Sequence, residues 1–135
     1  MKPCPKPAKR KKRKTAATGK VKKLDNAFRE KIMERDGRCV ICGTTERLQW
    51  SHLITRRKWR TRWDPKNSAM MCAACHFKHH KQGPEDFVLW TIKRYGLEWY
   101  EQMVLESKIP MSPAQKKDLI DDLLEISNSI GFDFR

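Results

Sequence analysis

Apolar residues recur at helical spacing in the segment that follows a basic N-terminal stretch. Asp25 can cap a helix there, and Phe28, Ile32 and Met33 then recur about one turn apart. Gly37 suits the end of such a helix, because glycine readily adopts the left-handed conformation that closes many helices. The pattern predicts an amphipathic helix between Asp25 and Gly37.

An alternating pattern replaces the helical one in the middle of the chain. Leu48, Trp50 and His52 share one face of an extended segment over residues 48–53. Residues 68–71 can form a second short strand. Two short strands are therefore predicted, separated by a connection rich in Arg, Lys and Trp.

Helical spacing returns in the last third of the chain. Pro84 suits the first turn of a helix that Gly96 ends, and residues 97–107 can form the next helix. Ser112 followed by Pro113 can cap a last helix. The apolar stripe of this last helix consists of Leu119, Ile120, Leu123, Leu124 and Ile130. We expect it to pack on the core or on a second copy of the chain.

Positive charge is concentrated at the N-terminus. The net charge is +14, and residues 1–23 hold eleven of the 30 Lys and Arg residues and none of the 16 acids. Such a segment cannot bury enough apolar surface to fold, so a disordered tail is predicted over residues 1–24. We expect it to contact nucleic-acid phosphates; a solubilising or expression-derived extension is the alternative. From Leu97 onward acids outnumber bases eight to four, so we expect this region not to lie along DNA.

Length and composition point to one small domain with extensions. The chain has 135 residues, of which 39% are apolar and 34% are charged, so a metal staple or a partner would help a core of this size. It contains no run of eighteen apolar residues, and its N-terminus lacks the apolar stretch of a secretory signal. These features predict a protein with no membrane partner, in the cytoplasm, where thiols stay reduced.

Four of the five cysteines form two C-x-x-C pairs. The pairs are Cys39 with Cys42 and Cys72 with Cys75, whereas Cys4 lies in the tail and is read as a spare thiol. Two such pairs suit a tetrahedral zinc ion, and in a reducing compartment zinc is favoured over the alternative of disulfides. A site with four cysteine ligands is closed, so this zinc is predicted to be structural.

The histidines gather in the same stretch as the cysteines. His52 is on the first predicted strand, Asn67 is in the turn that precedes the second, and His76 directly follows the last cysteine. This order resembles the HNH (ββα-metal) endonucleases. Residues 39–107 resemble the phage NinG/Rap recombination nucleases, and the same core is similar to phage endonuclease VII, which also has two C-x-x-C pairs. The matching features are Cys39-x-x-Cys42-Gly43-Thr44, Gln49-Trp50 before His52, Asn67 before the second cysteine pair, and His80-Lys81-x-Gly83.

The resemblance implies a role for each of these polar residues. His52 would be the general base, since a neutral imidazole accepts a proton near neutral pH. Asn67 would shape the loop and orient that base. His76 would bind a catalytic divalent ion, and His80, four residues further along a short helix predicted over residues 76–81, could be a second ligand. His79 is the weaker candidate, because its side chain points further round the helix.

One position departs from the family pattern. Many HNH nucleases carry a metal-binding acid immediately before the general base, and here that position is Ser51. The catalytic ion is expected to be Mg²⁺ or a transition ion, and imidazole ligands favour Mn²⁺, Ni²⁺ or Zn²⁺ over Mg²⁺.

The connection between the predicted strands is a candidate DNA-binding loop. Arg and Lys side chains bind phosphates, and tryptophans can stack on exposed bases. A solvated loop with two core tryptophans is the alternative. The residues expected to contact DNA are Arg56, Arg57, Lys58, Trp59, Arg60, Arg62 and, beyond the second cysteine pair, Lys81.

Together these patterns predict an α+β protein with a small, zinc-stapled ββα-metal (HNH) core. Its parts would be a disordered basic tail (1–24), the nuclease core (25–83) and a C-terminal helical extension (84–135). The expected function is metal-dependent hydrolysis of DNA, with branched or recombination-intermediate DNA suggested by the resemblance. The alternatives are a non-catalytic, zinc-dependent nucleic-acid-binding module and a nuclease directed at RNA. A homodimer through the C-terminal helices is possible, and a phage-encoded protein would act in the bacterial cytoplasm.

Overall fold

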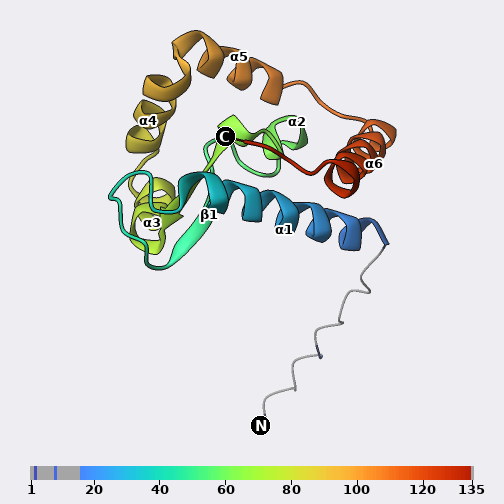
Figure 1. The fold of residues 1–135 in the computed structure, drawn as a ribbon, viewed down its shortest axis with the longest axis horizontal. Helices are drawn as coiled ribbons and strands as arrows, with labels where there is room; N and C mark the ends of the chain where they lie inside the picture. Colours follow the sequence, from blue (N-terminus) through green and yellow to red (C-terminus); the bar gives the residue numbers. More distant parts are fainter. Residues whose placement is uncertain (1, 3–7, 9–15, 135) are drawn as a thin grey trace.

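The computed structural model describes residue 2, residue 8 and residues 16–134 (Figure 1). Cys4 and most of the predicted tail therefore lie outside the described residues. Within them, the chain forms a small α+β fold of six α-helices and one two-stranded sheet. The α+β class agrees with the sequence prediction, whereas a short helix over residues 59–62 occupies part of the segment that was expected to be a loop. The elements are α1 (Ala16–Asp36), β1 (Leu48–His52), α2 (Trp59–Arg62), the 3₁₀ turn η1 (Pro65–Asn67), β2 (Ser68–Cys72), α3 (Ala73–Lys81), α4 (Glu85–Tyr95), α5 (Leu97–Ser107) and α6 (Pro113–Ser129).

Helix α1 begins earlier than the sequence pattern predicts. It starts at Ala16, so the boundary between a disordered tail and the core at residues 24 and 25 is wrong. The reason is that the buried stripe of Phe28 and Ile32 continues back to Leu24, which is 0% exposed. Asp25 therefore lies inside the helix and does not cap it. Gly37, with φ of +64°, ends α1 as predicted, and its N–H donates to the Met33 carbonyl at 2.8 Å.

The two strands pair antiparallel and separate two hydrophobic clusters. Leu48 is opposite Cys72 and His52 is opposite Ser68, and every residue of β2 is buried. Met70 of β2 belongs to the cluster under α1 and α6, whereas Met71 belongs to a second cluster beside the cysteines. The sheet is thus covered on both faces by segments from distant parts of the chain.

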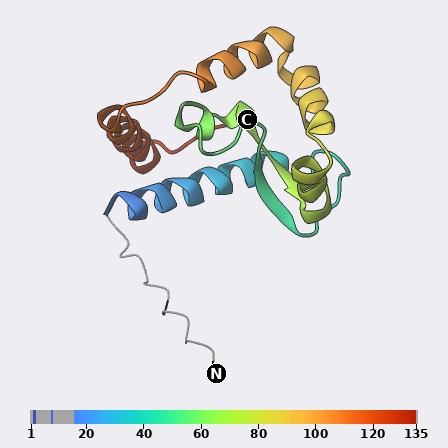
Figure 2. The ribbon, with the colours of Figure 1, turned by 180° about the vertical axis from the view of Figure 1, so that it is seen from behind.

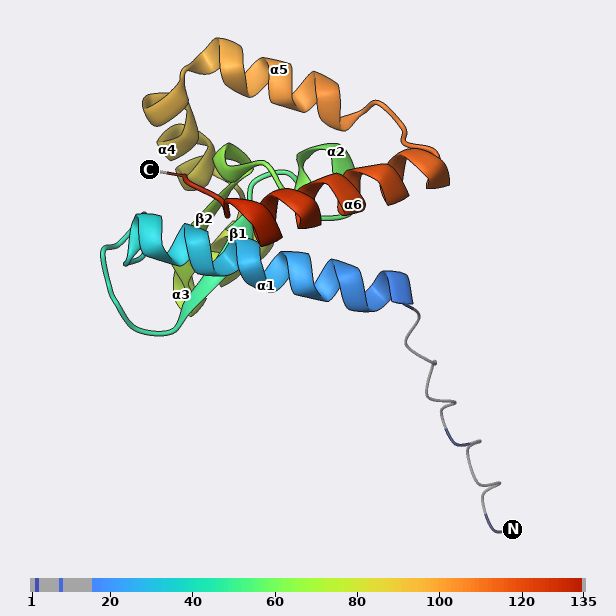
Figure 3. The ribbon, with the colours of Figure 1, turned by 45° about the vertical axis from the view of Figure 1, so that its right-hand side comes forward.

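Helix α6 lies beside α1 and closes the first cluster (Figure 3). Ser112 caps it as predicted, in a capping box with Gln115. Ile120 and Leu124 of the predicted stripe are buried in the cluster, whereas Ile130 is 86% exposed. The alternative in which this stripe packs on the chain's own core is therefore the one observed for its central residues.

The chain beyond α6 returns to the middle of the fold (Figure 1). Phe132 and Phe134 contact Phe28 of α1, with ring centroids 5.2 and 4.6 Å from that ring. This segment completes the cover of the first cluster.

Helices α4 and α5 form an arc on the side of the molecule away from α1 (Figure 2). Gly96, with φ of +96°, joins them, and α5 packs against α2. Phe87 of α4 fills the second hydrophobic cluster. Among the described residues, no helix is long and apolar enough to cross a membrane.

A buried ion pair fixes the end of α1 to the start of β2. Arg35 pairs with Asp36 at 2.7 Å, and the two side chains are 4% and 1% exposed. Arg35 also donates to the carbonyls of Pro65 and Ser68, and Asp36 accepts the N–H of Met70. The pair therefore holds the turn before β2, from which Asn67 extends.

Candidate functional site

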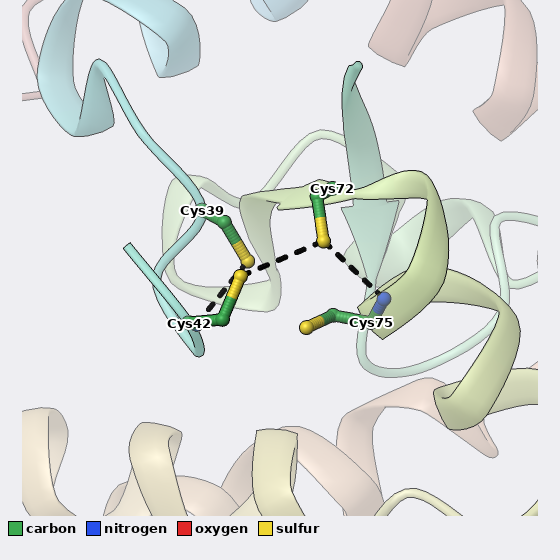
Figure 4. Close-up of side chains that lie close together, drawn as sticks. All are labelled: Cys39, Cys42, Cys72 and Cys75. Carbon is green, nitrogen blue, oxygen red and sulfur yellow. Dashed lines mark hydrogen bonds between the residues drawn. The ribbon is translucent and has the colours of Figure 1, made fainter. Parts of the chain in front are cut away.

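Two tight turns bring the four cysteines of the paired motifs together (Figure 4). Cys39 and Cys42 flank the loop after α1, where Gly43, with φ of +79°, donates its N–H to the Cys39 carbonyl. Cys72 ends β2 and caps α3, whose first turn contains Cys75. In each pair the N–H of the second cysteine donates to the sulfur of the first, at 3.5 and 3.4 Å.

The sulfur positions fit a single tetrahedral metal ion. All four Sγ atoms lie within 4.8 Å of one another, and those of Cys42 and Cys72 are 3.7 Å apart. Zinc–sulfur bonds of about 2.3 Å in tetrahedral geometry place neighbouring sulfurs roughly 3.8 Å apart. A disulfide would instead need about 2.05 Å. The cluster is therefore compatible with structural zinc, which would join the loop after α1 to β2 and α3.

The ionisation of the thiols is consistent with a cation site. Burial raises the pKa of Cys39, but hydrogen bonds from the backbone of Cys42, Cys72 and Ile41 outweigh it and lower the pKa to about 6. Burial and the neighbouring cysteines raise the pKa of Cys75. Four thiolates this close repel one another, so a dication between them is what would allow all four to ionise.

His52 lies at the end of β1 with one ring nitrogen committed to the backbone. Its Nε2 is 3.0 Å from the carbonyl oxygen of Arg62. Because a carbonyl only accepts, Nε2 carries the proton and Nδ1 keeps a free lone pair. Burial lowers the pKa of His52 to about 4, with the Arg62 carbonyl acting in the opposite direction. The ring is therefore neutral at neutral pH.

Asp25 holds the segment that positions His52. Its carboxylate accepts from Nε and Nη2 of Arg62 and, at 2.9 Å, from the indole N–H of Trp63. The sequence pattern predicted that Asp25 caps a helix and did not indicate this contact. The only available signal was a carboxylate next to the apolar stripe of α1.

Asn67 is fully buried and connects three backbone groups. Its Oδ1 accepts the N–H of Ile54 at 2.8 Å, and its Nδ2 donates to the carbonyls of Ile54 and Thr61 at 3.1 and 2.9 Å. Ile54 follows β1, and Thr61 lies in α2, one residue before the carbonyl that holds His52. Asn67 therefore fixes the loop that leaves β1 relative to α2.

His76 and His80 face each other on α3. Their Nε2 atoms are 2.6 Å apart, and Nδ1 of His76 is 3.0 Å from the Ser51 hydroxyl. That hydroxyl can donate to the carbonyl of Gln49, at 3.3 Å, while its oxygen accepts from Nδ1–H of His76. Nε2 of His76 then has a lone pair that accepts a hydrogen bond from Nε2–H of His80. Burial, followed by the neighbouring His80, lowers the pKa of His76.

His79 has a different set of contacts. Its Nε2 donates to the carbonyl of His52 at 3.2 Å, and its ring meets Phe87 edge to face at 5.3 Å. The buried Nδ1 has no hydrogen-bond partner among the described residues. These contacts attach the end of β1 to α3, so His79 has a structural role.

His52 of β1 and the pair of His76 and His80 on α3 line one cleft. It has a volume of about 430 Å³ and is lined by Trp50, His52, Thr55, Arg56, His76 and His80. No carboxylate is among these residues. The cleft thus combines a neutral imidazole, a pair of convergent imidazoles and one guanidinium.

The predicted DNA-binding residues do not share one surface. Arg56 lines the cleft, whereas Arg57, Lys58, Trp59 and Arg60 line a separate groove. The Arg62 guanidinium is instead bound to Asp25. Trp63 is 6% exposed, so the alternative of a core tryptophan describes it, and Lys81 is exposed at the end of α3.

Comparison of the chain with protein-family models, curated proteins and solved structures finds no match.

Proposed function

We propose that this chain is a metal-dependent nuclease of the HNH type that hydrolyses DNA phosphodiester bonds, with β1, β2 and α3 as its ββα-metal core. The observation that carries the proposal is the single cleft that contains His52 from the strand and the convergent pair of His76 and His80 from the helix. The cysteine cluster supports it, because zinc there would hold the helix against the strand.

The hydrogen bonds give each side chain a chemical role. His52, held through Nε2, offers Nδ1 to a water molecule and takes its proton as the water oxygen attacks phosphorus. The bond from phosphorus to the leaving oxygen then breaks, and that oxygen departs with the bonding electrons and takes up a proton from solvent. Arg56 can pair with a non-bridging phosphate oxygen. A divalent ion on His76 and His80 would supply charge stabilisation at the phosphate.

Ser51 gives the proposed ion site its particular character. Where an acid would bind the ion directly, Ser51 instead accepts a hydrogen bond from His76 and orients its ring. A site with two imidazoles and no carboxylate favours Mn²⁺, Ni²⁺ or Zn²⁺ over Mg²⁺. We therefore expect transition ions to support cleavage better than Mg²⁺.

The absence of a carboxylate from the cleft lining favours one competing function. A zinc-dependent module that binds nucleic acid without cutting it would need the cysteine cluster and the basic surfaces but no acid. The hydrogen bonds that leave a lone pair on both His52 and His76 favour the nuclease, because a binding module gains nothing from them.

Cleavage of a supercoiled plasmid and of a four-way junction would test the proposal, with Mg²⁺, Mn²⁺, Ni²⁺ and Zn²⁺ added in turn. We expect His52→Ala to lower the cleavage rate by about 100-fold or more, as loss of a general base does. Zinc content and DNA affinity should stay unchanged, and Lys93→Gln on the exposed side of α4 should cut normally. Equal rates for His52→Ala and the unchanged protein would overturn the proposal.

The same assay addresses the remaining expectations about the substrate. Branched DNA is the preferred substrate that the family resemblance implies, and an RNA junction tested beside it separates the two nucleic acids. Symmetric cutting of a junction would suit a two-fold dimer. Because Ile120 and Leu124 are used within the chain, a dimer through α6 would have to use residues such as Ile126 and Ile130, which are 41% and 86% exposed.

A further inference from the structure

A basic groove lies between α2 and the connection from α5 to α6. It has a volume of about 260 Å³. Five cations line it, Arg57, Lys58, Arg60, Lys108 and Lys116, together with Trp59 and no acid. Lys108 and Lys116 come from the region whose acidic balance predicted that it would not lie along DNA.

No acidic side chain among the described residues pairs with a cation of this groove. None of the five forms an ion pair with another described residue. Arg60 donates to the carbonyls of Ile109 and Pro110 at 3.0 and 3.3 Å, which fixes the far wall of the groove against α2. This arrangement fits an anionic ligand, and the phosphate backbone of a nucleic acid would pair with several of the cations at once.

An apolar hollow continues the groove. It has a volume of about 410 Å³, within the range of about 300–1,000 Å³ of small-ligand pockets. Trp59, Pro113 and Ile120 line it together with Lys20, Lys116, Lys117 and Asp121, and it shares Trp59 and Lys116 with the basic groove. Lys20 pairs with Asp121 at 2.9 Å, which leaves Lys116 and Lys117 without an ion pair among the described residues. The Lys116 ammonium is 5.3 Å from the centre of the Trp59 ring. A flat aromatic group attached to a phosphate matches this combination.

The groove also adjoins the histidine cleft. Arg56 lines the histidine cleft and the next residue, Arg57, lines the basic groove, so the cleft and the groove flank one loop. A strand whose phosphate is in the cleft would therefore be carried toward Trp59.

We propose that the groove and the hollow together bind an unpaired nucleotide of the DNA strand, with its phosphate on the cations and its base on Trp59. The choice of DNA rests on the proposed nuclease function. A base inside a duplex has its faces stacked on its neighbours, so only an unpaired base can enter the hollow. The preferred substrate is therefore DNA with a single-stranded gap or branch beside the cleaved bond.

Binding measured without cleavage tests this with the unchanged protein. Fluorescence anisotropy would compare three labelled DNAs: a perfect duplex, a duplex with a short single-stranded gap, and the same gap with abasic spacers. No catalytic ion and no chelator would be added, so that structural zinc remains. We expect the gapped DNA to bind about fivefold or more tightly than the other two. Equal affinity for the gapped and abasic DNAs would overturn the proposal.

Variants then locate the contact. Trp59→Leu should remove the preference for the gapped DNA, and Trp59→Phe should keep most of it. Lys108→Gln with Lys116→Gln should lower the slope of log affinity against log salt by roughly 0.7 for each lysine. Lys22→Gln with Lys93→Gln, which removes the same charge elsewhere, should leave the gap preference unchanged, and loss of the preference in this control would contradict the assignment.

The two proposals fail separately in these assays. A protein that cuts DNA but does not distinguish gapped from abasic DNA remains a nuclease without this nucleotide site. A protein that distinguishes them but never cuts has the nucleotide site without the nuclease function.

Discussion

At the scale of single residues, His52 and His76 each have one ring nitrogen held by another residue, while the second nitrogen of His76 contacts His80. The Arg62 carbonyl holds His52, and the Ser51 hydroxyl holds His76. Spacing alone could predict that His76 and His80 share a helix face. It could not predict which nitrogen is committed, because the carbonyl that binds His52 belongs to a residue ten positions away.

The environment of His52 predicts an unusual titration. Its pKa of about 4 is below the ordinary 6.5. As pH falls from 6.5 to 4, His52 therefore becomes protonated in the unfolded chain while it stays neutral in the folded chain. The contribution of His52 to folding stability is therefore complete above pH 6.5 and declines below it. An NMR titration of the histidine rings should show one pKa near 4 that disappears in His52→Ala. A value above 6 for that signal would contradict the buried, neutral ring.

At the scale of elements, the sequence predicted most of the secondary structure but misplaced the start of α1. The bounds of β1, α4 and α5 follow from alternation, helical spacing and glycine, which act locally. In α1 the lysines around Val21 and Leu24 resemble a solvated tail. Leu24 continues the helical spacing of Phe28 and Ile32, but the lysines around it hid that pattern, and its burial depends on the long-range contact with α6.

Leu24 should therefore behave as a core residue. Leu24→Ala removes a fully buried side chain and should lower the free energy of unfolding by about 2–5 kcal/mol. The exposed neighbour Lys22→Ala should change it by less than about 0.5 kcal/mol. Urea denaturation of both variants measures the difference. If both variants lost the same small amount of unfolding free energy, the first turns of α1 would not belong to the core.

At the scale of the whole molecule, the sheet is covered by two clusters that depend on different interactions. On one face, α1, α6 and the segment with Phe132 and Phe134 bury a continuous apolar core. On the other, Phe87 packs with Ala69, Met71 and the cysteine loop. The sequence predicted the zinc staple, but not which face of the sheet it would close, because that depends on the pairing of two strands far apart in the chain.

Removal of zinc should thus affect the two faces unequally. A chelator should first increase amide hydrogen exchange in α3 and in residues 39–44, because removal of the ion removes the bonds that would join these two segments. The amides of α1 and α6 should stay protected, since the first cluster contains none of the four cysteines. Cys42→Ser without added chelator should give the same pattern. A uniform loss of protection across all helices would show that the two clusters unfold as one unit.

Asn67 has a consequence for how the sequence can change. Its amide accepts one hydrogen bond and donates two, with no exposed surface. Asp lacks the donors and would bring a charge, and Gln is longer by a methylene in a site with no room for it. Saturation mutagenesis scored by folding stability should accordingly find this turn position as intolerant as the apolar core, while the exposed neighbour Lys66 should accept most substitutions. Purifying selection on this protein would then preserve the amide of Asn67, although the neighbouring sequence suggests only an ordinary turn.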